Sequence, residues 1–205
     1  MDSSVSRPAD CIIAILGAPA SGKGTLCKRL VADPPFAHLH HVSVGDLLRG
    51  MPSGPDINGH ILAGTVLPGY ELVPILASHI ASLPSPEGDR KVVLLDGFPR
   101  SLEQERAARH VLASAGNREF PDLAVYFKCP KEVLKERYVA RKRGADDGSL
   151  FEKRFEQHEK ECPDVVETYK ERGILVEVDS SGDINSSYNH FFDALGSYLA
   201  VKKID

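Results

Sequence analysis

The feature that most constrains the fold is an apolar run that ends in a glycine-rich turn. Residues 11–16 (CIIAIL) are all apolar, and Gly17 ends them. A short continuous apolar run is typical of a strand buried on both faces of a parallel sheet. The turn leads into residues 25–31, whose apolar side chains recur at helical spacing until Pro34 ends the helix. A buried strand, a glycine-rich turn and a helix therefore follow one another at the start of the chain.

Four further apolar segments alternate with helical patterns along the 205 residues. The predicted strands are residues 11–16, 41–44, 91–95, 123–127 and 174–178. The predicted helices are residues 25–31, short pieces within 45–82, 101–115, 131–143, 150–171 with a kink or break near Pro163, and 187–199. Strands that alternate with helices form a parallel sheet covered on both faces. The pattern predicts one α/β domain with a five-stranded parallel sheet.

Composition excludes several classes of protein. The formal net charge is −4 and the pI is near 6.1, which argues against a dedicated nucleic-acid binder. No apolar run approaches the roughly 20 residues that a membrane-spanning helix needs, so we expect no membrane partner and a cytoplasmic location. The four cysteines form no CxxC pair, and we expect buried free thiols at Cys11, Cys27, Cys129 and Cys162.

The first turn has the composition of a phosphate-binding loop. It reads Gly17, Ala18, Pro19, Ala20, Ser21, Gly22, Lys23, Gly24, Thr25. Its glycines allow successive backbone N–H groups to surround an anion, and the following helix adds the positive end of its dipole. Lys23 is placed to reach the β- and γ-phosphates of a nucleoside triphosphate. Since Gly24 replaces the hydroxyl that often follows the lysine, we expect Mg²⁺ to be held mostly by phosphate oxygens and water.

Three other segments carry charged groups suited to phosphates. Residues 43–49 (SVGDLLR) end in Arg49, and residues 96–100 (DGFPR) follow a predicted strand and precede Gln104 by one helical turn. Arg137 and Arg141 lie on one helix face because they are four residues apart. A guanidinium group matches the oxygens of a phosphate.

Together these motifs resemble the nucleoside monophosphate kinases, most closely the short-lid adenylate kinases and the UMP/CMP kinases. The resemblance spans about residues 12–195, nearly the whole chain. It implies a three-layer P-loop kinase fold in a single domain, residues 1–205. The core would comprise residues 11–44, 88–140 and 150–205. A small helical NMP-binding insert would cover about 45–82 and a short lid about 141–149.

The resemblance also implies roles for individual residues. Lys23, Arg100, Arg141 and Arg154 would be catalytic, Asp96 would hold Mg²⁺ through water, and Arg137 would stack on the adenine of ATP. The remaining acceptor contacts would be Val44, Arg49, Val66, Leu67, Gly97, Arg100 and Gln104. The lid departs from the family pattern, because Gly144 stands where an arginine is usual and Arg143 comes one residue earlier. Whether Arg143 replaces that arginine stays open.

The acceptor base is the main alternative that the sequence leaves open. Gln104 is typical of adenylate kinases, whereas Val44 stands where these enzymes have Thr and the UMP/CMP kinases have Ala. We predict transfer of the γ-phosphate of ATP to AMP, with Mg²⁺, in a monomer whose partners are small-molecule nucleotides. A UMP/CMP kinase is the first alternative. A different small-molecule kinase and a non-catalytic nucleotide-binding relative are the others.

Overall fold

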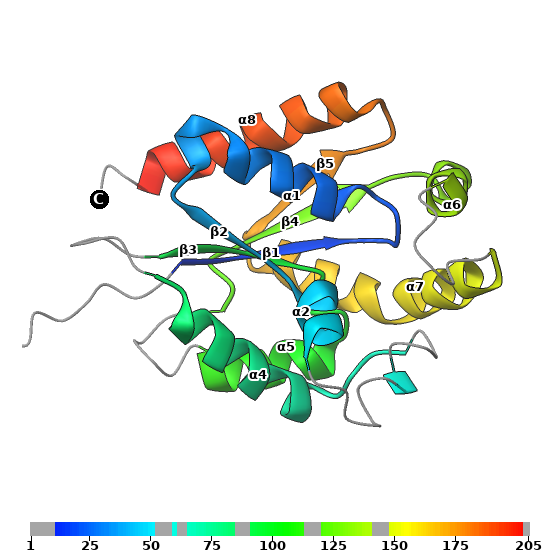
Figure 1. Cartoon of the computed structure of the whole chain (residues 1–205), viewed down its shortest axis with the longest axis horizontal. Helices are drawn as coiled ribbons and strands as arrows, with labels where there is room; N and C mark the ends of the chain where they lie inside the picture. The colour runs from blue at the N-terminus through cyan, green and yellow to red at the C-terminus, as the bar shows by residue number, and fades with distance from the viewer. Residues whose placement is uncertain are drawn as a thin grey trace, which may run out of the picture.

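The core of the molecule is a five-stranded parallel sheet with helices on both faces (Figure 1). The computed structural model describes residues 11–51, 59–60, 65–84, 91–112, 120–140 and 148–202. The strands are β1 (Cys11–Gly17), β2 (Leu39–Ser43), β3 (Val92–Asp96), β4 (Leu123–Lys128) and β5 (Leu175–Asp179). They lie in the order β2-β3-β1-β4-β5, and every neighbouring pair is parallel. The predicted α/β class and strand number are confirmed.

The described helices lie between these strands along the chain, except the last, which follows β5. They are α1 (Lys23–Ala32), α2 (Val44–Gly50), α4 (Gly69–Ser82), α5 (Leu102–Leu112), α6 (Lys131–Ala140), α7 (Gly148–Glu171) and α8 (Ile184–Lys202). A short 3₁₀ helix, Pro34–Phe36, follows α1. In Figure 1, α1 and α8 lie on one side of the sheet and α4, α5 and α7 lie on the other.

Alternate residues of β1 pack against opposite helix layers, because successive side chains of a strand point to opposite faces. Ile13 and Ile15 belong to the apolar cluster that includes residues of α1 and α8. Ile12 packs in the cluster with α4 and α5, and Leu16 in the cluster with α7. All four side chains are nearly inaccessible to solvent. The central strand is therefore buried on both faces, as its continuous apolar run predicts.

Two helix predictions need correction. The predicted break near Pro163 is wrong, because α7 runs through it without interruption. The neighbouring Cys162 and Val165 are buried, so packing on both sides of the proline holds the helix together. The last helix begins at Ile184, before the predicted residue 187, since the Asp183 carboxylate accepts hydrogen bonds from the first backbone N–H groups.

The cysteines are free thiols, as expected. Cys11, Cys27 and Cys162 are buried, but Cys129 is only partly buried because it follows the end of β4. No helix in the described ranges is both long and apolar enough to cross a membrane.

Candidate active site at the carboxyl end of the sheet

A cleft of about 600 Å³ opens beyond the carboxyl ends of β1 and β3. The phosphate loop, the start of α2, residues 65–67, the segment after β3, α7 and the start of α8 line it. In open α/β sheets this edge is where ligands bind. Of the predicted site residues, the cleft lining includes Lys23, Val44, Arg49, Val66, Leu67, Asp96, Gly97, Arg100, Gln104, Arg137 and Arg154.

The phosphate loop needs two of its glycines for conformational reasons. Gly17 has a φ of +141° and Gly22 a φ of +91°, which residues with a side chain rarely adopt. A Cβ atom on Gly17 would also lie 2.9 Å from the carbonyl oxygen of Phe127. Gly22 then caps the start of α1, where free backbone N–H groups favour an anion. The loop therefore has the shape that its sequence predicts.

Lys23 lies inside this loop. Its ammonium group donates hydrogen bonds to the carbonyl oxygens of Gly17 at 2.7 Å and Ala18 at 2.8 Å. Burial, with a smaller effect of the Arg100 cation, lowers the pKa of Lys23 to about 8 although the Asp96 carboxylate opposes the change. A bound phosphate would supply the negative charge that favours the protonated ammonium.

Asp96 ends β3 directly beside the loop. A Cβ atom on Gly24 would lie only 3.2 Å from its Oδ2. The same oxygen is 3.2 Å from Nε2 of His41, which β2 contributes. No group of three potential metal ligands occurs among the residues that the structure describes. A single carboxylate fits an ion whose other ligands are phosphate oxygens and water, as expected for Mg²⁺.

The acceptor side of the cleft carries Arg49 on α2. Its guanidinium group is about half exposed and bonds to the Asp46 carboxylate. The ammonium of Lys28 lies 3.8 Å from the other Asp46 oxygen. Asp46 thus lies between two cations, and these contacts lower the pKa of its carboxyl group although burial opposes them. A phosphate at this wall would meet two positive side chains.

Gln104 is buried and its amide is largely occupied. Its Oε1 accepts a hydrogen bond from the backbone N–H of Arg100 at 2.8 Å. Its Nε2 donates to the carbonyl oxygen of Leu67 at 2.7 Å. One amide hydrogen remains for another acceptor. The side chain therefore ties the segment after β3 to the wall that Val66 and Leu67 form, besides any role toward a base.

The apolar part of that wall consists of Val44, Leu67 and Leu72. Each is nearly inaccessible, and they belong to one cluster with the inner residues of α4. Val66 beside them is partly exposed. These apolar side chains line the cleft near the remaining Gln104 donor.

On the opposite side, Arg137 of α6 is held by backbone carbonyl groups. Its guanidinium donates to the carbonyl oxygens of Ser180 at 2.6 Å, Ser181 at 3.2 Å and Gly182 at 2.5 Å. Ile184 lines the same end of the cleft and is exposed. A base lying there would contact a fixed cation and an apolar side chain.

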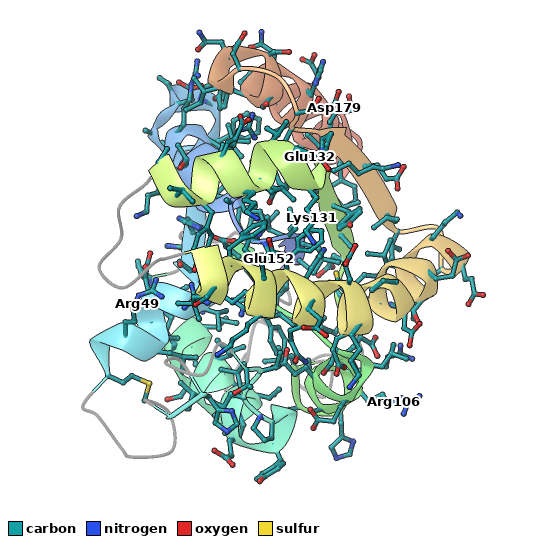
Figure 2. The ribbon with its side chains drawn as sticks, turned by 90° about the vertical axis from the view of Figure 1, so that its right-hand side faces the viewer. Arg49, Arg106, Lys131, Glu132, Glu152 and Asp179 are labelled. Carbon is teal, nitrogen blue, oxygen red and sulfur yellow. The ribbon has the colours of Figure 1, made fainter. Side chains whose placement is uncertain are left out.

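Arg154 reaches the cleft from α7, and its guanidinium donates to the hydroxyl of the buried Tyr138 at 2.9 Å. Arg141 and Arg143 lie outside the described residues, as do Gly144 and most of the predicted lid. Glu152 bridges α6 and α7, the helices that flank this segment. It pairs with Lys131 at 3.0 Å and Lys135 at 2.7 Å, and Figure 2 shows Lys131 and Glu152 between the two helices.

A comparison with protein-family models finds that residues 15–174 match the model described as adenylate kinase. The chain belongs to the adenylate kinase family. As a member, it is a phosphotransferase of the nucleoside monophosphate kinase type. The predicted family and enzyme class are therefore confirmed, and a non-catalytic relative or an unrelated small-molecule kinase is not supported.

Among curated proteins, this adenylate kinase family member is similar to UMP-CMP kinase 2 of Oryza sativa, with 34% identity over 82% of this chain and 67% of that protein. It is similar to the UMP-CMP kinase of Lentinula edodes, with 31% identity over 92% of this chain and 87% of that protein. It is also similar to the adenylate kinase of Nautilia profundicola, with 31% identity over 83% of this chain and 88% of that protein.

Sequence reasoning missed several cleft residues of this family member. His158 and Cys162 line the cleft, and His41 of the edge strand β2, outside the lining, contacts Asp96. His158 and Cys162 follow Arg154 at intervals of four residues, which places all three on one helix face. That spacing was the available signal.

Proposed function

We propose that this enzyme transfers the γ-phosphoryl group of ATP to a pyrimidine nucleoside monophosphate, CMP or UMP. The observation that carries the choice of acceptor is the similarity to two UMP-CMP kinases. UMP-CMP kinase 2 of Oryza sativa is 34% identical to this chain, compared with 31% for the adenylate kinase of Nautilia profundicola. The sequence favours AMP through Gln104 and through residues 169–173 (YKERG), which resemble the adenylate kinases. The Gln104 amide bonds to Leu67 and Arg100, so one hydrogen remains for a base. A single donor serves a pyrimidine as well as a purine.

The proposed reaction uses positioning and charge. The phosphate loop and Lys23 would hold the triphosphate, and Arg137 with Ile184 would contact its base. Arg49 would bind the acceptor phosphate, while Arg100, Arg154 and Arg141 would neutralise the transferring group. Mg²⁺ would be held by phosphate oxygens and by water on Asp96, and it would spread the charge of the phosphates. The acceptor is already an anion, so no general base is required.

The chain would be divided into a core, an NMP-binding insert at about 45–82 and a lid at about 141–149. Closure of both over the cleft would exclude water that could otherwise accept the phosphoryl group. A monomeric state and a cytoplasmic location remain predictions.

The test is a set of steady-state rates with MgATP and each of CMP, UMP, AMP and GMP. We expect kcat/KM for CMP or UMP to exceed that for AMP by at least about tenfold. The matched variant Gln104→Asn has the same amide on a shorter stem, which cannot reach both Leu67 and Arg100. We expect it to raise KM for every acceptor. AMP as the best substrate would overturn the pyrimidine assignment.

AMP remains the second candidate. Gln104 is the residue type that adenylate kinases use, and the adenylate kinase of Nautilia profundicola is 31% identical. The same substrate panel distinguishes the two, because this candidate requires AMP to be converted faster than CMP and UMP.

A further inference from the structure

His158 lies in the cleft but has no part in the reaction proposed above. It lies one turn after Arg154 and one turn before Cys162 on α7, and all three line the cavity. Its imidazole stacks on the ring of Tyr126 in β4, with centroids 6.3 Å apart and planes at 19°. The ring of Phe155 lies 6.5 Å away on its own helix. These contacts hold the imidazole against the end of the sheet.

The ring nitrogens of His158 make no hydrogen bond to the described residues. In that part of the chain, the buried side-chain polar atoms without a partner are the hydroxyl oxygens of Tyr169 and Ser187. The His158 nitrogens also lack a partner but are not among these buried atoms, so they are not fully buried. Since His158 lines the cleft, we take them to be accessible from it. An imidazole carries at least one N–H in either protonation state. His158 therefore offers the cleft a donor that no described residue uses.

The groups around this imidazole explain its charge. Burial, and then the cations of Lys23 and Arg100, lower the pKa of His158 to about 4. Burial raises the pKa of the Cys162 thiol to about 11 and also raises the pKa of the Tyr126 phenol. Near pH 7 those two groups are neutral. Of the described charged groups, the cations of Lys23 on α1 and Arg100 after β3 act on this neutral imidazole, and Arg154 lies one turn before it on α7.

We propose that His158 is a further phosphate-binding residue, whose imidazole donates a hydrogen bond to a phosphate oxygen of the nucleotide held between Lys23 and Arg100. This inference rests on the nucleotide site of the proposed function. The negative charge of the phosphates opposes the two cations that keep the imidazole neutral. Nucleotide binding therefore favours the imidazolium form, and the second ring nitrogen takes up a proton from the buffer.

The experiment compares binding of the non-hydrolysable ATP analogue AMPPNP, with Mg²⁺, to the wild type and His158→Phe. Isothermal titration calorimetry between pH 5.5 and 8 in buffers of different ionisation enthalpy measures the protons taken up. Titration of the analogue itself is common to both proteins and cancels in the difference. We expect the wild type to take up more protons, and its affinity to rise on acidification more steeply than that of the variant. For one linked proton the extra slope is at most about tenfold per pH unit.

Two further variants separate binding from packing. His158→Gln keeps an N–H donor that cannot take up a proton, so we expect near wild-type affinity at pH 8 without the extra proton uptake. It also tests the inference if the Phe variant fails to fold. His190→Gln changes an exposed histidine of α8, whose Nδ1 lies 3.1 Å from the carbonyl oxygen of Asp179, and should match the wild type.

Equal proton uptake by the wild type and both His158 variants would overturn the inference while leaving the proposed function intact. Failure of AMPPNP to bind the wild type at any pH would instead overturn the proposed nucleotide site, and this inference with it.

Discussion

The imidazole of His41, in the middle of β2, and the carboxylate of Asp96, at the carboxyl end of the neighbouring strand β3, lie 3.2 Å apart. Both side chains are more than nine-tenths buried. A buried carboxylate that loses a hydrogen-bonding partner is destabilised by its own desolvation. The pair therefore connects the edge strand to the group that we propose for Mg²⁺ binding.

The first prediction concerns this pair. His41→Phe should lower the free energy of unfolding by about 1–3 kcal/mol, because an Asp96 oxygen loses its partner. His41→Asn keeps a donor and should lose less. Urea denaturation followed by circular dichroism measures both. Equal stability of His41→Phe and the wild type would contradict the proposed contribution of this contact.

The second prediction concerns pH and Lys23. Its pKa of about 8 means that the ammonium of the free protein loses its proton as pH rises through that value. Bound phosphate favours the charged form, so the pKa in the complex is higher. The contribution of Lys23 to the affinity for MgAMPPNP should therefore be constant below pH 8 and fall above it.

Lys23→Met provides the control for that decline. It should bind more weakly by on the order of 10²-fold, because a charge-assisted contact is lost, and its affinity should not fall in the same window. Binding measured from pH 7 to 10 decides the matter. A decline of the same size in the variant would assign it to another group.

The third prediction concerns the arginine that follows β3. Arg100→Ala should reduce kcat by about 10²-fold or more, because it removes a cation that we propose to neutralise the transferring group. Arg106→Ala is the matched control, since Arg106 is exposed on α5 outside the cleft lining, as Figure 2 shows. Near-normal turnover of Arg100→Ala in a coupled assay would refute its catalytic role.

The fourth prediction concerns a buried charge away from the cleft. Glu105 of α5 is 1% exposed and pairs with Arg109 at 2.6 Å and Arg172 at 3.5 Å. Glu105→Leu leaves the partly buried Arg172 without this carboxylate, and it should reduce the free energy of unfolding by about 3 kcal/mol. Arg109→Ala, at a half-exposed partner, should cost under about 1 kcal/mol. Thermal melting and urea titration measure both, with kcat as the activity control.

Much of the fold could be predicted because it depends on local patterns. The strands β1, β3 and β4 are short apolar runs, and the phosphate loop is a contiguous segment in which Gly17 and Gly22 adopt positive φ. The second strand is predicted at 41–44 but spans Leu39–Ser43, because Val44 already begins α2. The break predicted at Pro163 was wrong because packing of Cys162 and Val165 outweighs the hydrogen bond that a proline removes. Helix α8 starts earlier than its apolar pattern predicts because Asp183 caps it.

The sequence alone thus determined the α/β class, the phosphate loop and the arginines suited to phosphates, since each is written in neighbouring residues. Only the tertiary structure decided that His41 touches Asp96, that Gln104 joins Leu67 to Arg100, and that His158 lines the same cleft as Lys23 and Arg100. These partners are brought together by the strand order and by the packing of α7 on one face of the sheet. Contacts between residues far apart in the chain depend on that packing, and no local pattern encodes them.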